Sequence, residues 1–219
     1  MPLFGETSIQ HTLQQQWEMV IHYSGVTLCI NRFSNLWTWN SNIRHLVNQG
    51  HAQNALVLFR QMKQSGVTPN NSTFPFVLKA CAKHSHRRNS QIIYARVLKS
   101  CFQSNIFVQT AMVDMYAKCG HLDDAHNVFV EMPVRDIASW NAMLLGFAQS
   151  GFLDRLPCLL RHMRLSGIRP DTVTVLLLID AVLCVKSLTF LGAVHSFGIR
   201  IGVHMDVSVA YSKLMKWIQ

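Results

Sequence analysis

Apolar residues recur along the chain at the spacing of one face of a helix. The first run holds four of them, Trp39, Ile43, Leu46 and Val47. The second holds Ala55, Leu58, Phe59 and Met62. Gly50 closes the first run, and Ser65-Gly66 followed by Pro69 closes the second, which is the usual residue chemistry of a helix C-terminus. The pattern therefore predicts two consecutive helices joined by a short turn.

This helix pair repeats. Three sequence pairs share one register: Trp39-Asn40 with Trp140-Asn141, Met62–Asn70 with Met163–Asp171, and Phe59-x-x-Met62 with Phe129-x-x-Met132. The members of the first two pairs are 101 residues apart and those of the third are 70 apart. The register divides the chain into windows at 36–70, 71–105, 106–136, 137–171 and 172–206. Residues 1–35 form an N-terminal segment, and 207–219 begin an incomplete sixth window, so we expect a frayed or truncated C-terminal end.

Stacking follows from this periodicity. A single helical hairpin cannot bury both of its apolar faces, so neighbouring hairpins must pack on each other. We therefore expect an all-α solenoid with no sheet, whose concave face is lined by the first helix of each window. Pro75 lies near a predicted helix start, where proline is tolerated. Pro157 lies midway through a predicted second helix, where it should break or kink it at a cost of about 3 kcal/mol.

Composition narrows the class of protein. The 219 residues are 49% hydrophobic and 14% charged, which excludes an intrinsically disordered chain. Lys and Arg number 20 against 11 acidic residues, and the net charge of +9 suggests a polyanionic partner, nucleic acid or an anionic membrane surface. The longest apolar run, Val173–Val185, contains Asp180 and is too short to span a bilayer, so we expect no membrane segment.

Cysteine spacing argues against a metal site or a redox dithiol. The six cysteines include no Cys-x-x-Cys pair. Cys81-x-x-His84-x-His86 has metal-binding residue types, but no fourth ligand lies nearby. We expect no metal and no cofactor.

The repeats resemble the pentatricopeptide repeat family of plant organelles, and more narrowly its PLS branch of long, ordinary and short repeats. The ordinary type is carried by Ser139-Trp-Asn-Ala-Met143 and Ser166-Gly-Ile-Arg-Pro-Asp171. Phe74–Cys81 is similar to the start of the long type. Met115–Gly120 followed by Met132-Pro133-x-Arg135-Asp136 is similar to the short type. The resemblance covers residues 36–206 and implies a right-handed superhelix. It also implies binding of single-stranded RNA, one base per repeat.

In that family the fifth and last residues of a repeat read the base. The matching pairs here are Asn40 with Asn70, Thr110 with Asp136, and Asn141 with Asp171. The family's preferences imply a partial site of C or U, any base, G, U, any base. The alternative is that these residues merely cap helices, which is a stronger alternative for Asn70, Asp136 and Asp171 than for the residues within the first helix. Two further pairs do not match the family's base-reading residues, because neither a proline nor a leucine side chain can hydrogen-bond a base. They are Pro75 with Asn105 and Leu176 with Asp206, and we expect their repeats to set the spacing between reading repeats.

Two further sets of residues follow from the resemblance. The second residue of a repeat packs against base faces, and the matching residues are Trp37, Phe107, Ala138 and Val173. The alternative is packing within or between repeats. Lys83 and Lys118 occupy equal places late in a first helix, where they would meet phosphates or lie in solvent.

The sequence thus favours a non-enzymatic, RNA-binding adaptor in organellar RNA processing or editing. Alternatives are a protein-interaction solenoid and a truncated remnant with weak RNA binding. Nucleobase deaminases need His-x-Glu and Pro-Cys-x-x-Cys, and neither motif occurs, so a deaminase or editing factor would act in trans. The family implies mitochondria or plastids, and we expect mitochondria, although residues 1–34 make a poor transit peptide.

Overall fold

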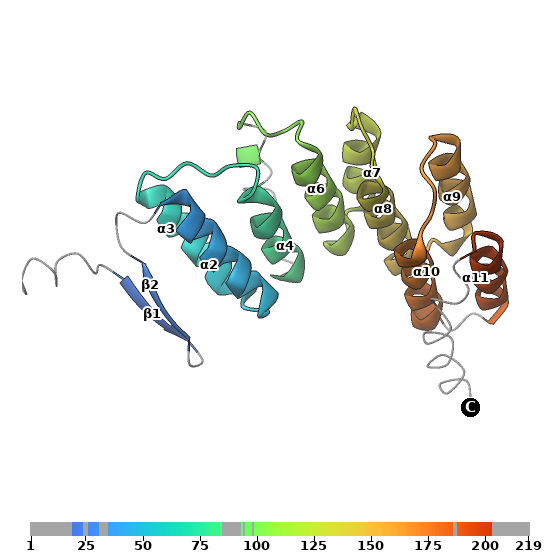
Figure 1. The fold of residues 1–219 in the computed structure, drawn as a ribbon, viewed down its shortest axis with the longest axis horizontal. Helices are drawn as coiled ribbons and strands as arrows, with labels where there is room; N and C mark the ends of the chain where they lie inside the picture. Colours follow the sequence, from blue (N-terminus) through green and yellow to red (C-terminus); the bar gives the residue numbers. More distant parts are fainter. Residues whose placement is uncertain are drawn as a thin grey trace, which may run out of the picture. The chain divides into compact units, whose positions relative to one another are not determined.

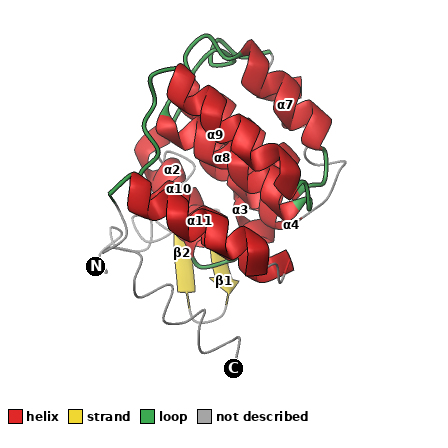
Figure 2. Cartoon of the chain, turned by 90° about the vertical axis from the view of Figure 1, so that its right-hand side faces the viewer, coloured by secondary structure: helices red, strands yellow, loops and turns green. Residues whose placement is uncertain are grey.

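The computed structural model describes residues 19–23, 26–30, 35–84, 93, 95–97, 99–185 and 188–202. The chain divides into two compact units, residues 1–80 and residues 81–219. Helices account for nearly all the regular structure of the described residues (Figure 2).

A small sheet lies before the first repeat. Strands β1 (Met19–Tyr23) and β2 (Val26–Ile30) pair antiparallel, with Met19 opposite Ile30 and Tyr23 opposite Val26. The expectation of no sheet is therefore wrong for this segment. Both five-residue runs are rich in β-branched and aromatic residues and are separated by two residues that include a glycine, which is a hairpin pattern. Because no helical repeat includes it, the hairpin leaves the repeat architecture unchanged.

The first unit contains the first helical hairpin, α2 (Leu36–Asn48) and α3 (Ala52–Gln64), which pack on each other. All eight apolar residues predicted to face the core are at most 2% exposed. Gly50 and Gly66 follow the two helices at φ of 88° and 77°. This left-handed conformation strains other residues, so glycine supplies the helix ends as predicted. Helix α4 (Phe74–His84) begins in this unit, and its Phe74 ring lies 6.4 Å from that of Phe59.

The second unit continues the pattern. Its elements are α6 (Ile106–Lys118), α7 (Leu122–Glu131), α8 (Ile137–Gln149), the 3-10 turn η1 (Leu153–Arg155), α9 (Leu156–Leu165), α10 (Thr172–Val185) and α11 (Leu188–Arg200). The first helices pack in succession, α6 on α8 and α8 on α10, while α7 and α11 pack on the first helices of their own repeats (Figure 1). The predicted class, stacked helical hairpins of an α-solenoid, is confirmed for the repeats.

Pro157 does not interrupt a helix. The second helix of the fourth repeat starts at Leu156, with Pro157 in its first turn, and η1 occupies the place where the helix was expected to begin. The predicted break is therefore wrong. Proline lacks an amide hydrogen that the first turn of a helix does not need, so delaying the start of the helix removes the penalty.

The short third repeat ends without a glycine. Helix α7 is followed by Met132 in an extended conformation, at φ of −62° and ψ of 122°. The Arg135 guanidinium instead donates to the last carbonyls of the helix, from Nε to Phe129 O at 2.7 Å and from a terminal nitrogen to Val130 O. Arg135 thus satisfies the helix end that glycine closes elsewhere, which allows a window of 31 residues.

Two first helices approach very closely at Gly146. A Cβ atom added to this residue of α8 would lie 2.6 Å from Ala117 Cβ on α6. No such atom fits without backbone movement. Glycine here sets the spacing between the third and fourth repeats.

Candidate functional site

Each first helix is preceded by an Asn or Asp whose side chain caps it. The Oδ1 atom accepts the backbone N–H three residues later, at 2.9 to 3.3 Å, and this N–H belongs to the first turn of the helix or, for Asn70, to the turn directly before it. The caps are Asn35, Asn70, Asn105, Asp136 and Asp171. The capping alternative is therefore correct for Asn70, Asp136 and Asp171. It does not exclude a second role, since each side chain has another terminal atom.

In the fourth repeat the two candidate readers are joined through Thr174. The Thr174 hydroxyl lies 2.8 Å from Asn141 Oδ1 and 2.9 Å from Asp171 Oδ1. Thr174 N donates to Asp171 Oδ1 at 2.9 Å. Asn141 is 8% exposed, and its Nδ2 has no hydrogen-bond partner among the described residues and is not sealed from solvent. A donor on Asn141 and the second carboxylate oxygen of Asp171 are thus left for a ligand.

The first repeat uses the same device with a different outcome. The Thr73 hydroxyl lies 2.7 Å from Asn40 Oδ1, and Asn40 Nδ2 donates to Asn70 Oδ1 at 3.2 Å. Both polar ends of Asn40 are therefore bonded within the protein. Asn70 Nδ2 has no hydrogen-bond partner among the described residues, so it is the donor of this pair that remains available to a ligand.

Thr110 lies in a different environment. Its hydroxyl is buried and has no hydrogen-bond partner among the described residues. The equivalent of Thr73 and Thr174 in the next repeat is Ser139, whose hydroxyl donates to Asp136 O at 2.8 Å instead. The third repeat therefore combines an unpaired hydroxyl with an Asp136 side chain that caps α8.

The second residues of the repeats lie at the surface. Trp37 is 75% exposed, Phe107 66% and Val173 52%, and Ala138 is exposed as well. Burial in the core, one part of the alternative, is therefore wrong for these four positions. The rings of Trp37 and Phe107 are therefore accessible, and an accessible aromatic face can stack on a base.

Lys83 and Lys118, the two residues expected to meet phosphates, lie in different surroundings. Lys118 pairs with Asp114 one turn earlier, at 2.7 Å, and both side chains are partly exposed. Lys83 is exposed at the matching place on α4. Of the poorly fitting pairs, Pro75 lies in the first turn of α4, Asn105 caps α6 and Leu176 is 36% exposed. Asp206 lies outside the described residues.

Sequence reasoning missed the threonines that connect the repeats. Thr73 and Thr174 are fully buried and occupy the third place of their windows. The signal was present, because Thr38, Thr73, Ser139 and Thr174 all place a hydroxyl there. The hydroxyls of Thr73 and Thr174 contact the first helix of the preceding repeat, and the periodicity within one window does not reveal such a contact.

The described part of the chain lacks two other kinds of site. Its His, Cys, Asp and Glu side chains form no group of three or more that is placed to hold a metal ion. Among the same residues, no helix combines the length and apolar character that crossing a membrane requires.

The stacked helical hairpins, each with an Asn or Asp cap before its first helix, define a helical-repeat protein. Residues 34–83 match the PPR repeat family, and residues 110–137 and 138–168 match the PPR repeat. The repeat region of this chain belongs to the pentatricopeptide repeat family.

Relatives agree with this assignment. A mitochondrial pentatricopeptide repeat-containing protein of Arabidopsis thaliana is 48% identical over 181 residues, 83% of this chain and 28% of its own length. A chloroplastic one from the same plant is 37% identical over 179 residues, 82% of this chain and 33% of its length. The chain thus spans about a third or less of these relatives.

Solved structures share the fold. The pentatricopeptide repeat protein PPR10, crystallised with an 18-nt psaJ RNA element, superposes with a TM-score of 0.61 at 17% identity, over 88% of this chain and 27% of PPR10. The nuclear proteinaceous RNase P 2 of A. thaliana superposes with a TM-score of 0.50 at 16% identity, over 75% of this chain and 38% of that protein.

Proposed function

We propose that this chain is a sequence-selective, single-stranded RNA-binding adaptor in which a repeat reads one base. The observation that carries the proposal is the pairing of Asn141 with Asp171. Thr174 fixes the carboxamide oxygen of Asn141, so its NH₂ group remains as a donor beside a carboxylate acceptor. A base edge that presents an acceptor next to an N–H donor, as uracil does, complements this arrangement.

Several features support the proposal. The exposed rings of Trp37 and Phe107 suit stacking on bases. The net charge of +9 suits a polyanion. The RNA carried by PPR10 supports RNA as the partner of a repeat protein of this fold.

The chain would act without chemistry of its own. RNA processing or editing would require a deaminase or another factor supplied in trans, because the deaminase motifs are absent from this sequence. Mitochondrial and chloroplastic relatives support an organellar location, and we propose the mitochondrion, with the plastid as the alternative.

Binding to short RNAs that differ in one base tests the proposal. In the wild type, uridine opposite the fourth repeat should be preferred over the other bases by about tenfold. Asn141→Ala should remove this preference. The matched control is Asn127→Ala, which removes an exposed amide from the second helix α7 and should leave the preference intact. If the wild type binds all the RNAs equally, the base-reading proposal is wrong. If it binds none of them, RNA binding itself is excluded.

A further inference from the structure

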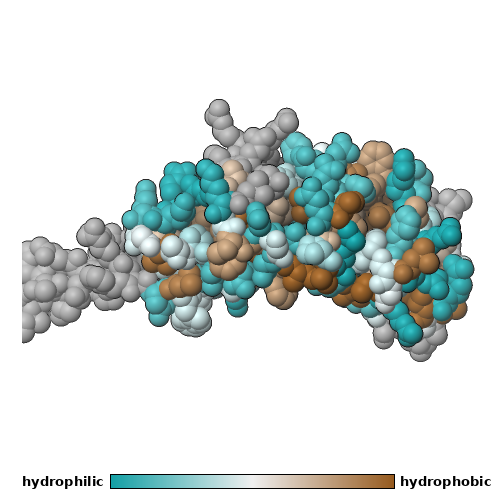
Figure 3. Space-filling view, turned by 90° about the horizontal axis from the view of Figure 1, so that it is seen from above, coloured by the Kyte–Doolittle hydropathy of each residue, from teal (hydrophilic) through white to brown (hydrophobic). Residues whose placement is uncertain are grey.

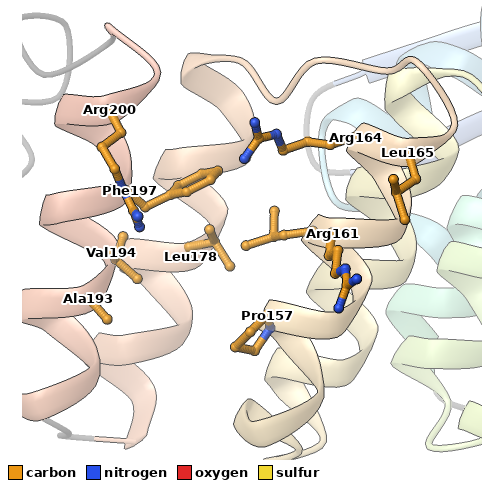
Figure 4. A pocket seen from close by; sticks show the side chains of 10 residues that line it. Pro157, Arg161, Arg164, Leu165, Leu178, Ala193, Val194, Phe197 and Arg200 are labelled. Atoms are coloured by element: carbon orange, nitrogen blue, oxygen red, sulfur yellow. The ribbon is translucent and has the colours of Figure 1, made fainter.

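The second helices of the fourth and fifth repeats border a half-open cavity that the RNA proposal does not use. Helix α9 packs on α8, but it does not pack closely on α11, and the space between α9 and α11 is a cavity of about 490 Å³. Leu178 of α10 lies at its floor (Figure 4). The volume is within the range of ligand sites, which is about 300–1,000 Å³.

The lining combines an apolar interior with cations. Leu160, Leu178 and Val194 contribute aliphatic surface. Arg164 of α9 and Arg200 of α11 reach from opposite sides toward the Phe197 ring (Figure 4). A second, adjoining cavity shares Arg164, Phe197 and Arg200 and adds Arg169.

These cations have no counter-charge within the described structure. No acidic side chain lines either cavity. Arg161, Arg164 and Arg200 are exposed, and none of them forms an ion pair with a described residue. A guanidinium binds a carboxylate through two parallel hydrogen bonds, so three unpaired arginines around one cavity favour an acidic ligand.

The large apolar side chains that the structure describes as exposed come from several different helices and loops. Figure 3 shows apolar side chains interrupted by hydrophilic ones on the face it presents. The cavity differs because its apolar surface is concave and continuous and has arginines at its edge. Arginine and aromatic residues around an apolar recess are typical of the centre of a protein interface.

We propose that this cavity, lined by α9, α10 and α11, docks an acidic amphipathic segment of a partner protein, with a leucine or aromatic side chain in the recess and carboxylates on the arginines. RNA fits less well. The recess offers no hydrogen-bond acceptor among its side chains, so an inserted base would leave its N–H donors unpaired. The chain's own last residues fit less well too, because 203–219 contain one acidic residue, Asp206, against two lysines, Lys213 and Lys216.

A titration of the full chain tests this docking site. The probe is a short fluorescein-labelled peptide with Leu and Phe at helical spacing and Glu and Asp between them, followed by fluorescence anisotropy. Charge reversal by Arg164→Glu with Arg200→Glu should weaken its binding by about tenfold or more. The matched control is Arg60→Glu with Lys63→Glu on α3, which changes the net charge equally and should weaken it about twofold at most.

A second variant separates the recess from the charge. Ala193→Trp adds a large side chain at an exposed position that lines the cavity and keeps every arginine. It should abolish peptide binding while RNA affinity stays unchanged, which also distinguishes this proposal from the RNA-binding one. Far-UV circular dichroism identifies any variant that does not fold.

Two outcomes would overturn the docking proposal. The first is equal weakening of the peptide by both double variants, which would mean that only net charge matters. The second is displacement of the peptide by single-stranded RNA, together with loss of RNA binding in the Arg164 and Arg200 double variant but not in the α3 control. The cavity would then be part of an RNA surface.

Discussion

The Thr174 hydroxyl lies 2.8 Å from Asn141 Oδ1 and so connects the first helices of two consecutive repeats. Thr73 does the same to Asn40, at 2.7 Å. A buried threonine therefore orients the side chain that we propose as a base reader one repeat earlier. The base recognition that we propose for one repeat would therefore depend on the sequence of the next.

Removing this hydroxyl tests the connection. Thr174→Val keeps the shape of the side chain but leaves Asn141 Oδ1 without its donor, which should lower the free energy of unfolding by about 1–3 kcal/mol. It should also reduce the preference for uridine. The control is Thr38→Val, because the Thr38 hydroxyl bonds at an exposed site to its own cap, Asn35. Urea denaturation and the RNA panel measure both effects. Equal destabilisation by the two variants would contradict the bridging role.

Base selectivity in the third repeat should follow the residue at position 110. Thr110→Asn should move the preference at the third base from guanosine toward uridine, because a carboxamide then accompanies the Asp136 carboxylate. The salt dependence of binding should not change, since base contacts release no counterions. Binding to RNAs varied at the third base measures the effect. A loss of affinity that is the same for every base would mean that Thr110 supports the helix only.

A phosphate contact should show the opposite behaviour. Lys118→Ala should weaken all RNAs alike and reduce the slope of log affinity against log salt by about 0.7, because one counterion fewer is released. Titrations at several salt concentrations measure the slope. An unchanged slope would show that Lys118 acts through its pair with Asp114 rather than on RNA.

The close approach of α6 and α8 at Gly146 predicts that two glycine-to-alanine substitutions change stability in opposite directions. Gly146→Ala should destabilise the protein by about 1–3 kcal/mol, because the new methyl group meets Ala117 Cβ at 2.6 Å. Gly192→Ala in α11 meets nothing within 4 Å and should stabilise by about 0.5–1 kcal/mol through helix propensity. Thermal denaturation of the two variants should give shifts of opposite sign. Stabilisation by both would show that α6 and α8 can separate freely.

The contacts at the end of α7 predict that Arg135 stabilises the fold. Arg135→Ala removes donors to two terminal carbonyls and a guanidinium placed 5.2 Å from the Phe129 ring centre, so it should cost about 1–2 kcal/mol. In Arg155→Ala the lost partner is Asp154, 3.7 Å away with both side chains largely exposed, and the cost should be below about 0.5 kcal/mol. Urea denaturation compares the two, and similar costs would exclude the capping role.

Alkaline pH should weaken the fold through Cys81. Burial, with a smaller contribution from Cys119, raises the pKa of the Cys81 thiol from 9.0 to about 12. Between these values the unfolded chain loses a proton that the folded chain keeps, so stability falls as pH rises above 9. Cys81→Ala should flatten this fall, whereas Cys101→Ala, at an exposed site, should not. Denaturation across this pH range measures it, and identical slopes in both variants would exclude Cys81 as the cause.

The repeats were predictable from sequence because each window contains the apolar spacing of two helices and the residues that end them. Trp39, Ile43 and Phe59 occupy the core as their spacing requires. The delayed start of α9 at Pro157 and the β1–β2 hairpin were missed, since both are local exceptions outside the shared pattern. The bridges from Thr73 and Thr174 depend on the distance between neighbouring repeats, which helical periodicity does not contain.

The capping geometry limits how the last residue of a repeat can vary over evolution. Asn70, Asp136 and Asp171 must each accept a backbone N–H, and Asn, Asp, Ser and Thr are the side chains that do this well. Exchange within these four residue types keeps the helix start, whereas alanine costs about 1 kcal/mol at each position. The last residue of a repeat can therefore change during evolution without a compensating stabilising substitution elsewhere. The change is confined to these polar side chains, because they keep the helix cap.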